Sequence, residues 1–241
     1  MKIRFLGTNG WYDSTTGNTI SILIEAREGT IVLDAGNGIH KLDRFVKNQP
    51  VTLFLSHFHL DHVEGMHTLV KDRLKSLSIY GMEGTEKILN EIIRRPYTVP
   101  LANYPYPVSV GELPRDMEKV PYVEKVLPLV HADPCIGYRF KLEGKTLAYC
   151  TDTGMCDNLI TLAKDADLLI TECSELSGRQ SKGWPHLNPE NAVEIAKKSG
   201  AKQVALAHFN AHLYNTLESR KNVADRFTNL TVTYDDMEID L

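Results

Sequence analysis

The chain has 241 residues, of which 42% are hydrophobic, and its 27 Lys and Arg against 31 Asp and Glu give a formal net charge of −4. Such a composition is typical of a globular protein and excludes both a disordered tail and a membrane protein. The acidic balance argues against a protein whose main task is to coat nucleic acid, because affinity for the phosphate backbone comes chiefly from Lys and Arg. A small anionic substrate stays open if the positive charge is local, for instance from metal ions.

The length favours one domain spanning residues 1–241. No apolar run approaches the ~18 residues that a membrane span needs, and residues 1–7 begin a strand pattern rather than a signal peptide, so we expect a cytoplasmic protein. Four cysteines without a Cys-x-x-Cys pair suit a reducing compartment, where they act as small hydrophobes. Oxidation would most readily join Cys150 and Cys156.

Short apolar runs predict strands in the first half of the chain, and amphipathic spacing predicts the helices between them. The expected strands cover residues 2–8, 18–26, 30–35, 51–56 and 77–80. The expected helices cover residues 39–46, 63–71 and 85–95. Six prolines between residues 96 and 121 then predict an extended, irregular surface segment.

The second half repeats the pattern of strands followed by helices. Strands are expected at 123–130, 136–142, 146–151, 168–171 and 203–207, and helices at 159–164 and 189–198, before a last helix and strand. Asn188 caps the helix at 189–198, and residues 174–187 form a loop. Two halves of this kind predict an α/β fold of two packed sheets with helices on the outer faces.

A histidine-rich motif, SHFHLDH at 56–62, follows directly after an apolar strand. Residues two apart in an extended segment point the same way, so His57 and His59 can hold one metal ion. Asp61 and His62, where the chain turns into a helix, can face a second ion. The composition gives this spacing by accident in roughly one case in a thousand. The motif therefore predicts a metal site.

Three further candidate ligands lie at the ends of later strands, where α/β sheets place their ligands. His131 follows VEKVLPLV, Asp152 follows the strand that ends in YCT, and His208 ends VALAH. A single His or Asp at such a position is more often structural. Together with the histidine-rich motif, these residues predict a metal centre.

With these residues in this order, the sequence resembles the metallo-β-lactamase superfamily over nearly its whole length. The resemblance implies an αββα sandwich of two mixed sheets and two divalent metal ions. One ion would be held by His57, His59 and His131, and the other by Asp61, His62 and His208, with Asp152 bridging. Lactamase-type members carry Cys at the place of Asp152, and oxygen-reducing di-iron members carry Glu at the place of His59, so a hydrolase with two full sites is implied. Nitrogen and carboxylate ligands suit zinc best and also admit manganese or iron.

The sequence resembles the ribonuclease Z-like phosphodiesterases more closely. The shared features are KIRFLGTNG at the start, GYRF at 137–140, LLITEC at 168–173, PHL at 185–187 and AHFN at 207–210. In that family a Glu and a His are paired near the leaving group, and Glu172 and His186 occupy those places, although Thr171 and Leu187 depart from the family's motifs. The resemblance also implies that Asp61 acts as a general base or orients the nucleophile.

Two departures from that family bear on the substrate. Members that trim tRNA carry a Pro-x-Lys-x-Arg-Asn loop after the first strand, where this chain reads DSTTGN at 13–18 without a basic residue. The segment 96–121 is also short and poor in Lys and Arg compared with the arm that clamps tRNA. We therefore expect a small or nucleotide-derived phosphodiester as the substrate, with RNA less favoured. The two ions would supply the missing positive charge.

The expected chemistry is hydrolysis by a hydroxide that the two ions activate, with Glu172 and His186 protonating the departing oxygen. Trp184 and His212 are candidate substrate-binding residues. Trp184, like Trp11 and Tyr12, could stack on a base, although anchoring of a loop is the commoner role of such aromatics. A position on a surface helix explains His212 equally well.

Other functions stay open at this point. The first alternative is a tRNA 3′-end endonuclease, and the second is a thioester, lactone or lactam hydrolase on the same metal centre. A non-catalytic metal-binding protein is the third, although a complete ligand set argues against it. The sequence also leaves open whether the chain forms a homodimer, as many members of the resembled family do. His40 and His67 are expected to be structural.

Overall fold

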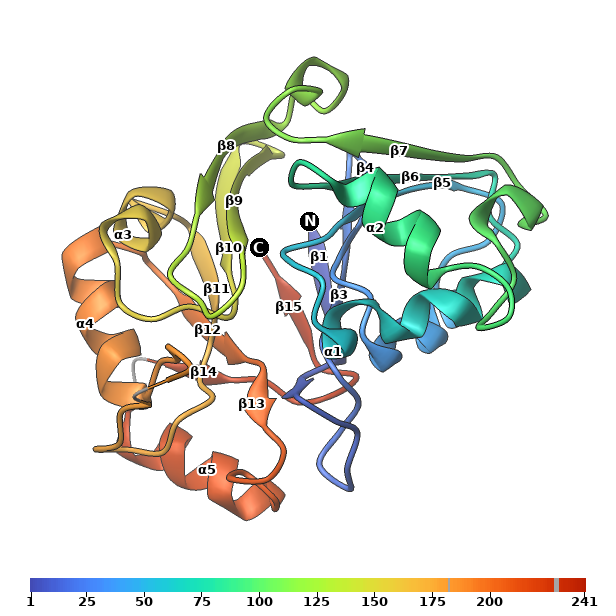
Figure 1. Cartoon of the computed structure of the whole chain (residues 1–241). Helices are drawn as coiled ribbons and strands as arrows, with labels where there is room; N and C mark the ends of the chain where they lie inside the picture. Colours follow the sequence, from blue (N-terminus) through green and yellow to red (C-terminus); the bar gives the residue numbers. More distant parts are fainter. Residues whose placement is uncertain (182, 228–229) are drawn as a thin grey trace.

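The computed structural model describes residues 1–181, 183–227 and 230–241, so one residue of the predicted loop at 174–187 lies outside the described residues. Two β-sheets lie face to face, and the helices cover their outer surfaces (Figure 1). The molecule is therefore the αββα sandwich that the sequence predicts. The chain ends lie close together, since the first and last strands pair.

The first sheet begins antiparallel and continues parallel. Its order across the sheet is β15-β1-β3-β4-β5-β6-β7 in the described part of the chain. The pairings from β1 to β4 are antiparallel and those from β4 to β7 are parallel. The strands are β1 (Lys2–Gly7), β3 (Ser21–Ala26), β4 (Gly29–Leu33), β5 (Pro50–Phe54), β6 (Ser76–Gly81), β7 (Val108–Glu112) and β15 (Glu238–Asp240).

The second sheet has the same mixed character. Its order across the described residues is β14-β12-β11-β10-β9-β8, antiparallel from β8 to β10 and parallel from β10 to β14. The strands are β8 (Val123–Pro128), β9 (Ile136–Leu142), β10 (Lys145–Cys150), β11 (Leu168–Glu172), β12 (Val204–Ala207) and β14 (Thr231–Val232). A small third ladder pairs β2 (Asn9–Gly10) with β13 (Phe209–Asn210) and joins the two halves.

Alternating side chains divide the apolar residues between layers. In β4, Ile31 and Leu33 belong to the core between the sheets, whereas Val32 packs on the helical side. Tyr138 and Phe140 of β9 meet Phe54 of β5 in the central core. This period of two is what a sheet buried on both faces requires.

Helices lie on both outer faces of the sandwich. The α-helices are α1 (Leu60–Val63), α2 (Thr85–Ile92), α3 (Asp157–Ala163), α4 (Pro189–Ser199) and α5 (Leu217–Arg226). Asn188 caps α4 as predicted, because its side chain accepts a hydrogen bond from the backbone N–H of Asn191 at 2.9 Å. None of the helices in the described ranges has the length and hydropathy needed to cross a lipid bilayer.

Two predicted α-helices of the first half differ in type. Residues 39–46 and 63–71 contain 3₁₀ helices, Asn37–Arg44 and Glu64–Lys71, with only α1 as an α-helical turn before the second. Over eight residues, apolar spacing does not separate a period of 3.0 from one of 3.6. A Cβ on Gly65 would lie 2.2 Å from the carbonyl oxygen of Gly36, so the two segments pack backbone against backbone.

The proline-rich segment 96–121 is more ordered than its composition predicts. It contains the edge strand β7 and two short 3₁₀ helices, Leu101–Asn103 and Met117–Lys119. Tyr104 and Tyr106 are buried, and their hydroxyls donate to the backbone oxygens of Met66 and Leu69 at 2.8 and 2.6 Å. The prolines flank the strand rather than interrupt it, so its hydrogen bonds can form.

The smaller structural predictions are met. All four cysteines are free thiols, and three of them are buried, which agrees with their expected packing as small hydrophobes. His40 and His67 each place Nδ1 within hydrogen-bond distance of a nearby backbone oxygen, at 2.6 and 2.5 Å. These contacts agree with structural roles for both histidines.

Candidate metal centre

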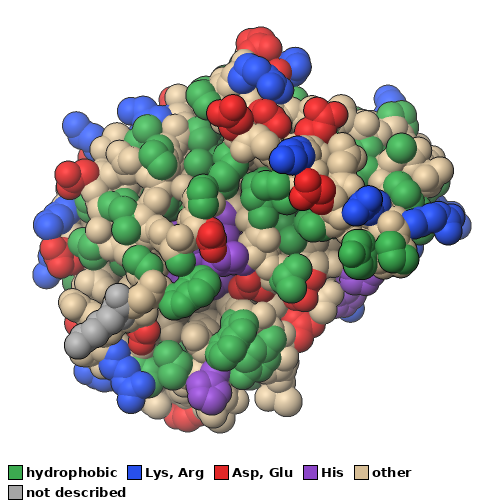
Figure 2. Space-filling model, in the orientation of Figure 1, with side chains coloured by type: hydrophobic (Ala, Val, Ile, Leu, Met, Phe, Trp, Pro, Cys, Tyr) green, Lys and Arg blue, Asp and Glu red, His purple; other side chains and the backbone are tan. Residues whose placement is uncertain are grey.

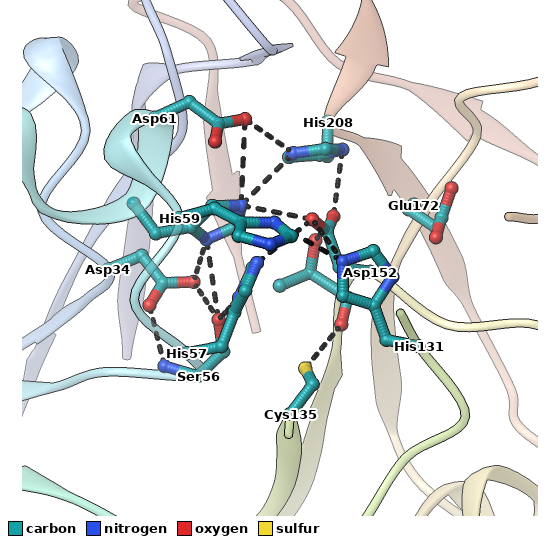
Figure 3. Close-up of polar contacts among 12 residues, drawn as sticks. Asp34, Ser56, His57, His59, Asp61, His131, Cys135, Asp152, Glu172 and His208 are labelled. Atoms are coloured by element: carbon teal, nitrogen blue, oxygen red, sulfur yellow. Dashed lines mark hydrogen bonds and ion pairs between the residues drawn. The ribbon is translucent and has the colours of Figure 1, made fainter. Parts of the chain in front are cut away.

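The predicted ligands come from both halves of the chain and meet at one edge of the sandwich. The segment 57–62 follows β5 of the first sheet and enters α1. His131, Asp152 and His208 follow β8, β10 and β12 of the second sheet. Figure 3 shows the side chains converging from the two sheets. The structure therefore brings together every residue that the resemblance assigns to a metal.

The first group consists of His57, His59, His131 and Asp152. Each offers one ligand atom, and these atoms lie within 4.8 Å of one another. Nε2 of His131 lies 3.3 Å from Nδ1 of His59, and Nε2 of His57 lies 3.3 Å from Oδ2 of Asp152. Three imidazoles and one carboxylate at this spacing match the donor set and number that zinc takes.

The second group consists of Asp61, His62 and His208, again within 4.8 Å of one another. Nε2 of His208 lies 3.1 Å from Nε2 of His62 and 3.2 Å from Oδ2 of Asp61. Asp152 touches both groups, because its Oδ2 is 3.3 Å from His62 Nε2 and its Oδ1 is 3.0 Å from His208 Nδ1. Its carboxylate therefore stands between the two groups.

Two observations show that these residues fit a metal ion. The buried atoms His57 Nε2 and His131 Nδ1 have no hydrogen-bond partner among the described residues, because the 3.3 Å contact between His57 Nε2 and Asp152 lacks hydrogen-bond geometry. A buried polar atom without a partner costs free energy, which an ion at the first group would recover for His57. The donors are imidazole nitrogens and carboxylate oxygens, a set that suits zinc and also manganese or iron.

The pKa values of the site residues also agree with a bound metal ion. Burial alone would lower the pKa of His208, but the Asp152 carboxylate raises it to about 10. Burial lowers the pKa of His57 to about 4, and the charge of His62 adds to this effect. The Asp61 pKa falls despite burial, since His62 and His208 stabilise its anion. The carboxylates of Asp61 and Asp152 thus stabilise positive charge at the second group, and a divalent ion would supply that charge.

Asp34 supports this centre and is absent from the predicted set. It follows β4 and is fully buried. Its Oδ2 accepts from Tyr149 Oη at 2.6 Å and from Ser56 Oγ at 2.8 Å, and lies 2.9 Å from Nδ1 of His62. Oδ1 accepts from the backbone N–H of Ser56 at 2.7 Å. A carboxylate bonded to the far nitrogen of a histidine fixes the ring and its tautomer.

Glu172 and His186 form the pair that the resemblance predicts. Nδ1 of His186 lies 2.8 Å from Oε1 and 3.0 Å from Oε2 of Glu172. The buried Glu172 carboxylate also accepts from the backbone N–H groups of Thr153 and Leu187, at 2.6 and 3.3 Å. Burial opposes the charged form of His186, but Glu172 raises its pKa overall. The His186 ring lies 5.3 Å from the His131 ring, so the pair borders the first group.

The candidate substrate-binding residues are exposed around the centre. Trp184 is 53% exposed, and its ring lies 5.5 Å from that of His59. Trp11 is 64% exposed and lies 6.3 Å from His212, which is itself exposed in a turn rather than on a helix. Both tryptophan rings are more than half exposed, which leaves part of each ring open to a substrate.

The fold and the arrangement of histidines and carboxylates are those of a metal-dependent hydrolase. The family described as beta-lactamase superfamily domain matches residues 29–209. The chain therefore belongs to the metallo-β-lactamase superfamily, as its motifs predict.

Individual relatives are distant but match along most or all of the chain. The probable metallo-hydrolase YhfI of Bacillus subtilis is 26% identical over 220 residues, 86% of each chain. Its crystal structure, described as a metallo-beta-lactamase fold protein, matches with a TM-score of 0.75 over 99% of this chain and 98% of that one. A ribonuclease Z of Methanosarcina mazei is 25% identical and covers 100% of this chain and 98% of the relative. A diphosphatase of the PhnP family gives a TM-score of 0.76 at 16% identity, over 100% of this chain and 97% of that one.

Proposed function

We propose that the protein is a metal-dependent phosphodiesterase that acts on a small or nucleotide-derived phosphodiester. The observation that carries the proposal is the Glu172–His186 pair directly beside two groups of metal-ligating side chains. A thioester, lactone or lactam hydrolase would use the same ligands but would not need this pair. Full-length similarity to proteins named ribonuclease Z supports phosphodiester chemistry.

Seven residues would hold two divalent ions. We assign His57, His59 and His131 to the first ion, Asp61, His62 and His208 to the second, and Asp152 to both. Divalent ions at such a centre lower the pKa of water and neutralise charge on the phosphate oxygens. Asp61 belongs to the second group, and its carboxylate would accept a proton from the attacking water or orient that water.

His186 would supply the proton to the departing oxygen. In the imidazolium form its Nδ1–H donates to Glu172 and its Nε2–H is the proton that is given up, which leaves the neutral ring with its proton on Nδ1. The buried carboxylate of Glu172 accepts backbone hydrogen bonds from both flanking segments, so the ring is held in a fixed orientation. Only a leaving group of high pKa needs this proton.

The test is hydrolysis of bis(p-nitrophenyl) phosphate by the purified protein with zinc or manganese. No turnover with either metal would refute the phosphodiesterase activity.

His186→Gln should slow the hydrolysis of esters with alkoxide leaving groups far more than that of esters of p-nitrophenol. His67 is an exposed histidine away from the site, so His67→Gln should slow neither. Equal slowing of both esters by His186→Gln would remove His186 from the acid role.

An RNA endonuclease is the second candidate, because the ribonuclease Z relatives cover nearly the whole chain. The loop at 13–18 has no basic residue, unlike the corresponding loop of the enzymes that trim tRNA. Asp13 accepts from the backbone N–H of Thr19 at 2.7 Å and from the side chain of Asn37 at 2.8 Å. We therefore expect cyclic nucleotides, dinucleotides or cyclic phosphates to be cleaved faster than precursor tRNA in a side-by-side panel.

A further inference from the structure

The chain has only two tryptophans, and both lie exposed beside the candidate metal centre. Trp184 lies next to the first group, since its ring is 5.5 Å from the His59 ring and 5.9 Å from the His131 ring. The backbone of Trp11 lies next to the second group, since its N–H donates to Oδ2 of Asp61 at 2.6 Å. An exposed tryptophan is therefore anchored next to each group of ligands.

The Trp11 ring is presented by a segment that is held in place. Trp11 has a φ of 76°, a conformation that bulky residues rarely adopt. The side chain of Asn9 donates to the backbone oxygens of Tyr12 and Gly17 at 3.2 and 2.8 Å, and closes the loop. Arg220, fully buried, donates to Asn9 and to Thr8. A strained and buttressed backbone with a solvent-exposed ring is typical of a binding surface rather than of packing.

The surface next to the ligands of the first group carries exposed apolar side chains and the Asp133 carboxylate rather than basic groups. Leu60, next to His59, is 71% exposed, and Val130, next to His131, is 48% exposed. Figure 2 shows hydrophobic side chains around the histidines in the middle of this face, with Lys and Arg mainly toward its edge. Such a rim suits flat, uncharged groups on either side of one phosphate and does not suit a long polyanion.

We propose that Trp11 and Trp184 are two stacking platforms and that the substrate is a diester with a planar group on each side of the scissile phosphorus, such as a dinucleoside phosphate. This inference rests on the proposed phosphodiesterase function. Trp184 lies two residues before His186 in the same loop, and both rings lie next to His131. The base of the leaving group therefore stacks on Trp184, and the base of the retained group stacks on Trp11.

The two tryptophans allow a direct binding test. Trp11→Phe leaves Trp184 as the sole tryptophan, and Trp184→Phe leaves Trp11. Titration of each variant, loaded with zinc or manganese, with the phosphorothioate analogue of thymidylyl-thymidine should quench its fluorescence. Diethyl phosphate at the same concentration should not. Quenching of only one tryptophan, or equal quenching by diethyl phosphate, would overturn the two-sided assignment.

A kinetic test separates the two platforms. We compare thymidine 5′-(p-nitrophenyl phosphate), which has a nucleoside as the retained group, with ethyl p-nitrophenyl phosphate. Trp11→Ala should raise the ratio of the KM for the thymidine ester to the KM for the ethyl ester by about 5- to 150-fold, and Trp11→Phe should restore much of the lost affinity. Trp184→Ala should raise both KM values together, because both esters share the planar leaving group.

Tyr97→Ala serves as the matched control, an exposed aromatic outside the site that should leave both KM values as they are. An unchanged KM ratio in Trp11→Ala would refute the platform, as would a loss confined to kcat. Failure of the proposed function has a different signature, because the wild-type protein would then cleave neither ester.

Discussion

Replacement of Asp34 by Asn should weaken both the fold and metal binding. The carboxylate is fully buried and faces four donors, on Ser56 (two), Tyr149 and His62. An amide can turn only one oxygen toward them, so in either orientation its NH₂ meets a donor. One buried donor left unpaired costs about 1–3 kcal/mol of stability. Asp34 has a φ of 55°, a conformation that Asn tolerates well, so backbone strain adds little.

The effect on metal binding comes through His62. Loss of the partner that orients a ligating histidine typically weakens metal affinity about 10- to 100-fold. Competition for zinc against a chromophoric chelator measures this change, and urea unfolding measures the stability. Asp43→Asn is the matched control, because Asp43 is exposed and pairs with Lys71 away from the centre. If Asp34→Asn is destabilised but keeps the zinc affinity of the wild type within about twofold, Asp34 is structural and the reasoning is wrong.

Three further substitutions test the packing of the fold and the seating of His208. Arg220→Met removes three buried hydrogen bonds and should cost about 3 kcal/mol in urea unfolding, whereas the exposed Arg226→Met should cost under about 0.5 kcal/mol. Burial raises the pKa of Asp72 from 3.8 to about 6, so the folded chain binds this proton more tightly than the unfolded chain and stability falls as pH rises through this range. Asp72→Asn should therefore stabilise the fold by about 2 kcal/mol at pH 7 and by much less at pH 4, and equal gains at both values would contradict the assignment. Gly10→Ala puts a Cβ 2.3 Å from Cε1 of the His208 ring and should lower zinc affinity in the same competition assay, with no change in affinity as the contrary result.

The sheets could be predicted from the sequence because most buried strands are apolar runs bounded by turns. The strand at 136–142 agrees with β9 at both ends, and 168–171 misses one residue of β11. The 3₁₀ helices could not be distinguished from α-helices, since eight residues of apolar spacing fit either period and the backbone contact of Gly36 with Gly65 is a tertiary one. The strand β7 could not be predicted because the prolines in 96–121 indicate an irregular segment. Its pairing with β6 depends on the tertiary structure.

The candidate ligands could be predicted because histidine spacing is a local signal and the strand ends converge in this fold. Asp34 and Arg220 could not be predicted in the same way. Asp34 gains its role from Tyr149, which is 115 residues away in the sequence. Arg220 lies on α5 and reaches Asn9 across 211 residues. For Asp34, an Asp directly after the apolar run TIVL was the available signal.

The small ladder between β2 and β13 affects when the chain can bind metal during its synthesis and folding. During synthesis the histidines at 57–62 leave the ribosome well before His208, and the ladder that seats His208 against Gly10 closes later still. A nascent chain thus carries half of a chelating cluster for a long interval. Metal captured in that interval would be held weakly, and tight retention would begin only when the two layers are joined, so metal loading would report on completion of folding.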